Sequence, residues 1–214
     1  LDPWGRWPIS GANTPSQWKA MLRAYLAATS FTDWTVGQVL KALADSPYAK
    51  NTIVVFWSDN GYHCGEKNHW EKGALWEQTT RTPLAIRLPG QSSAQLIIQP
   101  VSLVDLYPTL LDICNLETPK HQLGGSSLQA LLLGDQISHE KPILTTLGPE
   151  RYSLRTKKYR FIHYEDGSEE LYDLNKDPYE FDNLLLGMGA DSLLVYFRQL
   201  APKSWAPALS GRPY

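Results

Sequence analysis

The feature that most constrains the fold is a short run of β-branched and aromatic residues that stops abruptly at a polar turn. Residues 52–57 read TIVVFW, and residues 58–61, which follow them, read SDNG. A continuous run of this kind predicts a strand buried on both faces of a parallel sheet. Open α/β sheets bind ligands at the carboxyl ends of their strands. The sequence therefore places Asp59 and Asn60 where a ligand site is expected.

A long helix is predicted immediately before this strand. Thr14 is placed to be the N-cap, Pro15 to fill the first helical position and Gln17 to close a capping box. The helix is expected to bend near Phe31 and to end before Ser46. Its apolar positions recur at helical spacing: Trp18, Met21, Leu22, Tyr25, Leu26, Val36, Val39, Leu40 and Leu43. A helix followed by a buried strand is half of a βαβ unit, so we expect the α/β class.

The predicted secondary structure changes in character after residue 138. Upstream of it, a second strand is predicted at 83–88, with helices at 103–114 and 127–133. Downstream, short strand-like segments recur, with a hairpin signal at Asp166-Gly167 and a final helix at 192–200. The segments lie at 143–147, 151–155, 158–164 and 168–173. We expect an α/β part over 1–138 and a small antiparallel α+β subdomain over 139–214.

Composition argues against several classes of protein. Charged residues make up 20% of the chain and the formal net charge is −2, whereas a nucleic-acid surface needs a clustered basic excess. We interpret the basic cluster at 157–160 (KKYR) as the solvent face of one strand. No apolar run reaches the roughly 18 residues of a membrane span. Two cysteines do not make a disulfide framework, and Cys114, at the end of an apolar helix, is interpreted as a buried small side chain.

The loop after the first strand holds the candidate chemistry. Asp59 and Asn60 offer adjacent oxygen donors of the kind that Ca²⁺ and Mg²⁺ prefer, although Asp-Asn-Gly is also a common turn sequence. Polar and ionisable side chains then crowd the loop, which is either an active-site loop or a solvated one. They are His63, Glu66, Lys67, His69, Glu71 and Lys72. From these residues alone we predict an oxyanion or metal site at a strand end.

Several short motifs occur in a recognisable order along the chain. They read WSDNGYHCGE at 57–66, WEKG at 70–73, RTPL at 81–84, LPG at 88–90, SLVDLYPTLL at 102–111, ELYDL at 170–174 and DPYE at 177–180. In this order they resemble the formylglycine-dependent sulfatases of the alkaline phosphatase superfamily, nearest to the iduronate-sulfatase-like and choline-sulfatase-like branch. The resemblance covers about residues 20–185. It implies an alkaline-phosphatase-like mixed sheet flanked by helices, present here in part.

The resemblance also implies roles for individual residues. Asp59 and Asn60 would ligate a divalent cation, usually Ca²⁺, with Mg²⁺ or Mn²⁺ as alternatives. Lys72 would contact the sulfate oxygens, for which a compact cation with three donors is suited. His63 would contact the substrate or shape the loop. His69 and Trp70 are candidates for lining the substrate pocket.

The chain departs from the family pattern in two ways. Lys67 stands where the family often has His, and Cys64 where it usually has Leu, which affects details of substrate contact. The larger departure is that residues 1–214 lack the Cys/Ser-x-Pro-Ser-Arg motif whose first residue becomes the formylglycine nucleophile, and lack the upstream Asp-Asp ligands. The chain opens at Leu1 without a leader, so we expect a piece of a longer polypeptide that is inactive by itself.

Two alternatives to a sulfatase stay open. The first is a phosphodiesterase or phosphonate monoester hydrolase on the same scaffold. Those enzymes tend to carry His where Asn60 stands, so the asparagine favours the sulfatase. The second alternative is an inactive remnant that serves as a binding or structural module. A truncated sulfatase should expose an apolar sheet edge, whereas a stand-alone module should not.

The resemblance implies partners and a compartment without fixing them. The substrate would be a small sulfate ester of a sugar, an aryl alcohol or choline. A protein partner would be the missing N-terminal half or a second copy of the chain. Because the family is often exported, a periplasmic or secreted protein is expected, with the cytoplasm as the alternative.

Overall fold

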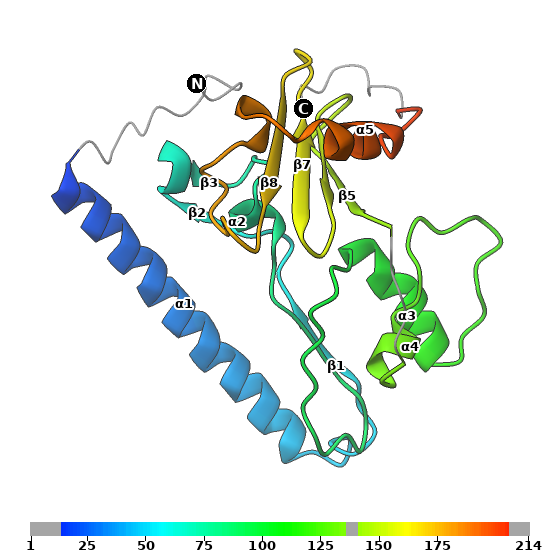
Figure 1. The fold of residues 1–214 in the computed structure, drawn as a ribbon. Helices are drawn as coiled ribbons and strands as arrows, with labels where there is room; N and C mark the ends of the chain where they lie inside the picture. The colour runs from blue at the N-terminus through cyan, green and yellow to red at the C-terminus, as the bar shows by residue number, and fades with distance from the viewer. Residues whose placement is uncertain (1–13, 136–140, 206–214) are drawn as a thin grey trace, which may run out of the picture. The chain divides into compact units, whose positions relative to one another are not determined.

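The computed structural model describes residues 14–135 and 141–205. The chain divides into two compact units, the first made of residues 1–72 and 82–94, and the second of 73–81 and 95–214. Figure 1 traces the elements of both. The predicted boundary at residue 138 lies outside the described residues and stays a prediction.

The first unit begins with a single long helix, α1 (Pro15–Ala44). The predicted capping box is present: Thr14 Oγ1 accepts from the Gln17 N–H at 3.3 Å, and Gln17 Oε1 accepts from the Thr14 N–H at 3.1 Å. These two bonds satisfy donors that a helix start otherwise leaves open. The helix continues without interruption through Phe31, where a bend was expected.

The strand predicted at 52–57 forms as β1 (Val54–Trp57), but its surroundings differ from the prediction. β1 pairs antiparallel with β4 (Leu84–Arg87), with Val55 opposite Ile86. Phe56 is 42% exposed and Trp57 is 51% exposed. The expectation of a parallel strand buried on both faces is therefore wrong for the described residues, in which every paired strand is antiparallel. Strand propensity is local, whereas burial needs further strands and helices on both faces.

The second unit contains the antiparallel sheet that the sequence predicts. Its order is β5 (Ile143–Thr146), β6 (Tyr152–Arg155), β7 (Tyr159–His163) and β8 (Glu169–Asp173). Gly167 takes φ +80° in the turn between the last two strands. Ser168 N–H donates to Asp166 Oδ1 at 2.9 Å in the same turn. The predicted hairpin is confirmed.

Helices and 3₁₀ turns complete the second unit. They are α2 (Glu77–Thr80), η2 (Leu103–Asp105), α3 (Leu106–Ile113), α4 (Gln129–Leu132), η3 (Leu184–Leu186) and α5 (Asp191–Gln199). Cys114 caps α3 and is exposed, so its interpretation as a buried side chain is wrong. No helix among the described residues is long and apolar enough to cross a membrane.

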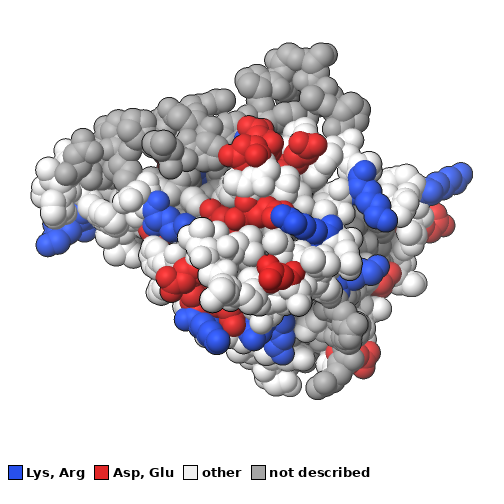
Figure 2. Space-filling model, turned by 45° about the horizontal axis from the view of Figure 1, so that its top comes forward, with Lys and Arg blue, Asp and Glu red and all other residues white. Residues whose placement is uncertain are grey.

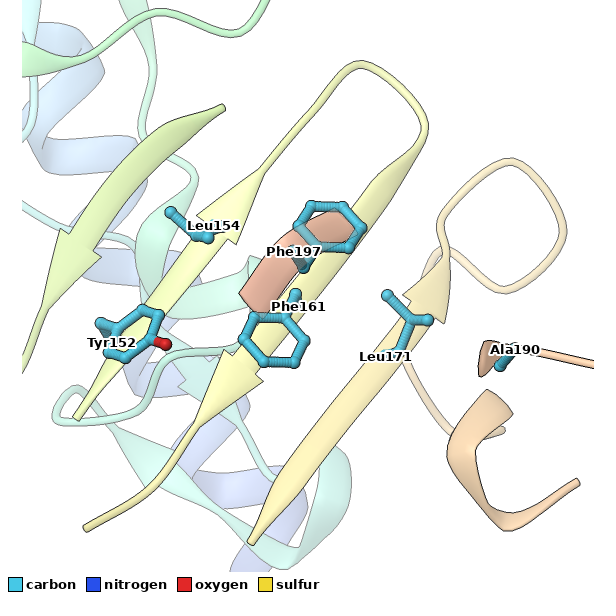
Figure 3. Close-up of a cluster of buried hydrophobic side chains, with 6 residues drawn as sticks. All are labelled: Tyr152, Leu154, Phe161, Leu171, Ala190 and Phe197. Atoms are coloured by element: carbon cyan, nitrogen blue, oxygen red, sulfur yellow. The ribbon is translucent and has the colours of Figure 1, made fainter. Parts of the chain in front are cut away.

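One face of the four-stranded sheet packs against α5 to form the main hydrophobic core. Phe161 of β7 and Phe197 of α5 are fully buried, and their rings stack with centroids 5.6 Å apart. Figure 3 shows the buried cluster that surrounds them, Tyr152, Leu154, Leu171 and Ala190. Residues that alternate along each strand supply this face, as the period of a strand requires.

The opposite face of β7 carries a buried charged cluster. Arg160 is only 2% exposed, so the interpretation of residues 157–160 as a solvent face is wrong at this position. Its guanidinium pairs with Glu77 and, through Nε at 2.7 Å, with Glu180 Oε1. Arg155 Nε donates to Glu77 Oε2 at 3.0 Å, and the Glu77 N–H donates to Glu180 Oε2 at 2.8 Å. Two arginines and two glutamates thus neutralise one another inside the unit.

Charged side chains of both signs also occur at the surface (Figure 2). On the face drawn in Figure 2, Lys and Arg side chains are interspersed with Asp and Glu. This mixture fits the formal net charge of −2.

Removing the charge of Glu77 is expected to destabilise the second unit strongly. Glu77→Gln leaves Arg160 buried with one fewer counter-charge, and breaking a buried pair on one side costs about 3–5 kcal/mol. Urea unfolding followed by circular dichroism measures the loss. The control is Asp45→Asn, which removes the carboxylate of an ion pair with Lys41 in which both side chains are exposed, by 66% and 72%. That change is expected to cost about 0–1 kcal/mol, and equal losses in the two variants would contradict the buried cluster.

The same cluster predicts a pH dependence. Burial alone raises the pKa of the Glu77 carboxyl, but the charges and hydrogen bonds of Arg160 and Arg155 outweigh it and hold the pKa below its ordinary value of 4.5. The stabilisation is therefore present above the ordinary pKa and is lost as pH falls through the lowered one. Glu77→Gln should flatten this acid limb of the stability curve.

Candidate functional site

The candidate site is the loop that leaves the carboxyl end of β1. It contains two short strands, β2 (His63–Cys64) and β3 (Trp70–Glu71), joined by the 3₁₀ turn η1 (Glu66–Asn68). The two strands pair antiparallel, with His63 opposite Glu71 and Cys64 opposite Trp70. This small hairpin belongs to the first unit together with β1. It carries the chain from Asn60 to Lys72.

The structure brings two of the predicted residues together. Lys72 Nζ lies 3.5 Å from Asn60 Oδ1, across twelve residues of sequence. The Asn60 amide is oriented by its Nδ2, which donates to the Gly61 carbonyl at 2.7 Å. Asp59 Oδ1 accepts from the Asn60 N–H at 3.0 Å. Asp59, Asn60 and Lys72 are thus linked at the carboxyl end of β1.

The donor set suits a hard cation in kind. A carboxylate and an amide oxygen on adjacent residues are ligands that Ca²⁺ and Mg²⁺ accept. Within residues 14–135 and 141–205, no group of three or more His, Cys, Asp and Glu side chains is arranged to hold a metal. Asp59 and Asn60 alone would not complete the ligand set of such an ion, and their predicted role as ligands stays a prediction.

His63 lies inside the hairpin. Its side chain has no exposed surface, its Nδ1 is 3.9 Å from Glu66 Oε2, and its ring meets that of His69 edge-on with centroids 4.9 Å apart. Burial, followed by the charge of His69, lowers the pKa of His63 from 6.5 to about 4 against the opposing effect of Glu66. The imidazole is therefore neutral at pH 7. Its predicted contact with substrate stays a prediction.

The other two predicted residues stand just before Lys72. His69 Nε2 lies 3.3 Å from the Lys72 carbonyl oxygen. The Trp70 indole is half-buried, and its ring meets that of Trp18 from α1 edge-on, with centroids 5.9 Å apart. Their predicted role in lining a substrate pocket is not tested by these contacts.

The hairpin has an unusual backbone. Lys67, Asn68 and Glu71 adopt φ of +54°, +57° and +69°, and Gly65 adopts +109°. Left-handed conformations of side-chain-bearing residues are uncommon and cluster where the surrounding structure imposes them, often at functional sites. Gly65 and Asn68 are residue types that favour this region, whereas Lys67 and Glu71 gave no such signal in the sequence.

Two residues with a clear part in the site were given no role from the sequence. Glu66 Oε2 accepts from the Cys64 N–H at 2.7 Å and so closes the turn from within. Trp18 was identified as an apolar position of a helix, and its contact with Trp70 was not predicted. Helical periodicity shows which face of α1 is apolar, but it does not say which loop that face meets.

Comparison with known proteins identifies the family. The sulfatase family model matches residues 6–116, and a second model, the C-terminal region of N-sulphoglucosamine sulphohydrolase, matches residues 65–199. The chain belongs to the sulfatase family. The motifs that suggested the resemblance all lie within these two matches. The loop residues Asp59 to Lys72 fall inside the first of them.

Individual relatives agree with this assignment. A sulfatase of Formosa agariphila is 38% identical over 95% of this chain and 39% of its own length. The solved structure of BT4656 in complex with its substrate, D-glucosamine-2-N,6-O-disulfate, is 28% identical with a TM-score of 0.75, over 86% of this chain and 40% of its own. The sulfatase-like fold is therefore present in part, and the chain spans about two fifths of these relatives.

The fold is shared by enzymes that act on other esters. The phosphonate monoester hydrolase of Agrobacterium radiobacter matches with a TM-score of 0.76 at 24% identity, over 87% of this chain and 42% of its own. At this identity the likeness shows the fold alone. Fold similarity therefore does not separate a sulfatase from a phosphonate hydrolase, and the separation depends on the residues of the site.

The buried position of His63 predicts its titration. Because the folded pKa is lowered to about 4 from 6.5, the unfolded chain binds more protons between these values, and stability is lost as pH falls through that window. NMR titration of the imidazole Cε1–H signal, assigned by comparison with His63→Gln, should show no protonation above about pH 5. A midpoint near 6.5 would mean that the ring is solvated.

Proposed function

We propose that these 214 residues are the C-terminal part of a sulfatase that hydrolyses sulfate monoesters, and that Asp59, Asn60 and Lys72 are this part's contribution to its active site. The placement nearer to the iduronate-sulfatase-like and choline-sulfatase-like branch is part of this proposal. So is a sulfated sugar, aryl alcohol or choline as the substrate class.

The observation that supports the proposal most is the distance of 3.5 Å between Lys72 Nζ and Asn60 Oδ1. The resemblance assigned one residue to the cation and the other to the sulfate, and a ligand that touches both requires them to be neighbours. The hairpin β2–β3 makes them so by reversing the chain between them.

The chemistry of the three side chains suits a sulfate ester. Lys72 is exposed and carries a compact charge with three donors, which can meet an anionic oxygen as its charge grows in the transition state. Asp59 and Asn60 would hold the divalent cation, which when bound supplies a Lewis acid that polarises the ester. In this proposal the charge of Lys72 and that of the cation would act on the same oxyanion, and the short distance between Lys72 and Asn60 supports this.

The nucleophile would come from residues outside this chain. Neither cysteine lies in the motif that yields formylglycine, since Cys64 is followed by Gly-Glu-Lys and Cys114 by Asn-Leu-Glu. The isolated 214 residues are therefore expected to release no sulfate, while a full-length enzyme that contains them is expected to do so.

The lysine can be tested in a full-length sulfatase that carries these residues. Lys72→Ala should lower kcat by about 10²–10³-fold, as the loss of one oxyanion donor does. The control is Lys50→Ala, which removes the same charge from an exposed position of the same unit outside the loop and is expected to keep kcat within about two-fold. Turnover of 4-nitrophenyl sulfate measures both. Equal kcat in Lys72→Ala and the parent enzyme would remove Lys72 from the active site.

The phosphonate hydrolase alternative can be distinguished from the sulfatase by the ester that the enzyme prefers. Asn60 offers an oxygen where that class tends to offer an imidazole, which favours a harder cation and the sulfatase. The same full-length enzyme should have the higher kcat/KM on 4-nitrophenyl sulfate than on 4-nitrophenyl phenylphosphonate. The reverse order would favour the alternative.

A further inference from the structure

Helix α1 places two aromatic side chains against the loop between Asn60 and Lys72. The Trp18 ring meets Trp70 at an interplanar angle of 68° with centroids 5.9 Å apart, and the Tyr25 ring stacks on Tyr62 at 23° with centroids 4.9 Å apart. Positions 18 and 25 are two helical turns apart, so they lie on one face of the helix. All four residues belong to the first unit, and each contact adds to simple burial the geometry that aromatic pairs prefer.

The loop backbone is shaped to receive the tryptophan. A Cβ added to Gly65 would lie 2.3 Å from Trp18 Cζ2 and 2.7 Å from Cη2, which no side chain permits. Gly65 is buried, and its N–H donates to the His69 carbonyl at 2.9 Å while its own carbonyl accepts from the Asn68 N–H at 3.1 Å. The indole therefore lies directly on the turn that closes the hairpin.

The contacts of Trp18 flank the strained part of the loop. Gly65 precedes Lys67 and Asn68, whose φ angles are positive, and Trp70 precedes Glu71, whose φ is also positive. Such conformations persist only where the surroundings impose them. Trp18 touches the loop before and after Lys67 and Asn68, and Lys72 follows Trp70 by two residues.

We propose that Trp18 is a positioning residue, which holds the loop in the conformation that keeps Lys72 beside Asn60, with Tyr25 against Tyr62 as a second contact. The tryptophan acts on the reaction through the loop and does not itself touch the substrate. The claim that Trp18 holds the loop is supported by the contacts alone. The claim that it affects activity rests on the proposed function.

The bracing can be tested on the 214-residue chain by amide hydrogen exchange. Trp18→Ala should speed exchange at the Gly65, Asn68 and His69 amides by at least about ten-fold, because local opening is resisted by buried apolar contacts. Trp34→Ala is the matched control. It removes the same side chain from the same helix, but Trp34 is 59% exposed and its ring contact is with Phe31, also in α1.

A further variant makes this test decisive. Trp18→Phe keeps an aromatic ring in place and should restore most of the protection. Far-UV circular dichroism shows that α1 has formed in each variant. Unchanged exchange at the three amides in Trp18→Ala, or an equal change in Trp34→Ala, would overturn the proposal.

The effect on activity is tested by a double-mutant cycle in the full-length enzyme. Trp18→Ala should lower kcat per folded molecule by about 10–100-fold, as a misplacement of a catalytic group of about 1 Å does. In the Lys72→Ala background the same change should have little further effect, because the two act as one unit. An equal loss in both backgrounds would show that Trp18 does not act through Lys72.

The outcomes separate this inference from the function on which it rests. If Lys72→Ala leaves kcat unchanged, the proposed role of Lys72 falls, and with it the claim about activity, while the exchange experiment still decides whether Trp18 holds the loop. If Lys72→Ala lowers kcat but Trp18→Ala does not, the function stands and the positioning role is wrong.

Discussion

The antiparallel pairing of β1 with β4 is the constraint on which the candidate site depends. It sets Trp57 opposite Leu84, so the chain that leaves β1 as a polar loop returns to the same point. Asp59 and Asn60 are thereby fixed at one end of a closed segment. Within this segment, the short hairpin β2–β3 reverses the chain and returns Lys72 to Asn60. Backbone pairing thus sets the geometry, and side chains supply the chemistry.

Side-chain packing stabilises the backbone of the loop between Gly65 and Lys72, whose conformation strand pairing alone does not determine. Three residues with side chains adopt positive φ between Gly65 and Lys72, a cost that needs compensation from the surroundings. Trp18 and the buried ring of His63 supply contacts on this stretch. The helix that looked in the sequence like a simple amphipathic element therefore takes part in shaping the loop.

Local patterns in the sequence predicted the helices and strands well. They did not predict which residues, far apart in the sequence, contact one another in the fold. The strands β5–β8 and the Asp166-Gly167 hairpin follow from alternation and turn chemistry, which act over a few residues. The N-terminus of α1 follows from its capping box for the same reason. By contrast, the burial of Arg160 depends on Glu77, which is 83 residues away in the sequence. The exposure of Cys114 and the pairing of β1 with β4 likewise depend on residues that are distant in the sequence.

The candidate site was also predicted only in its local features. Motif order predicted which residues belong to the loop and the family to which the chain belongs, while the proximity of Lys72 to Asn60 and the contact of Trp18 with Trp70 needed coordinates. The central claim, that these residues are one part of a formylglycine-dependent sulfatase, is tested most directly by sequencing the coding region upstream of the Leu1 codon. The account predicts an in-frame segment that encodes Asp-Asp and Cys/Ser-x-Pro-Ser-Arg. A start codon at that point, or an unrelated domain, would contradict it.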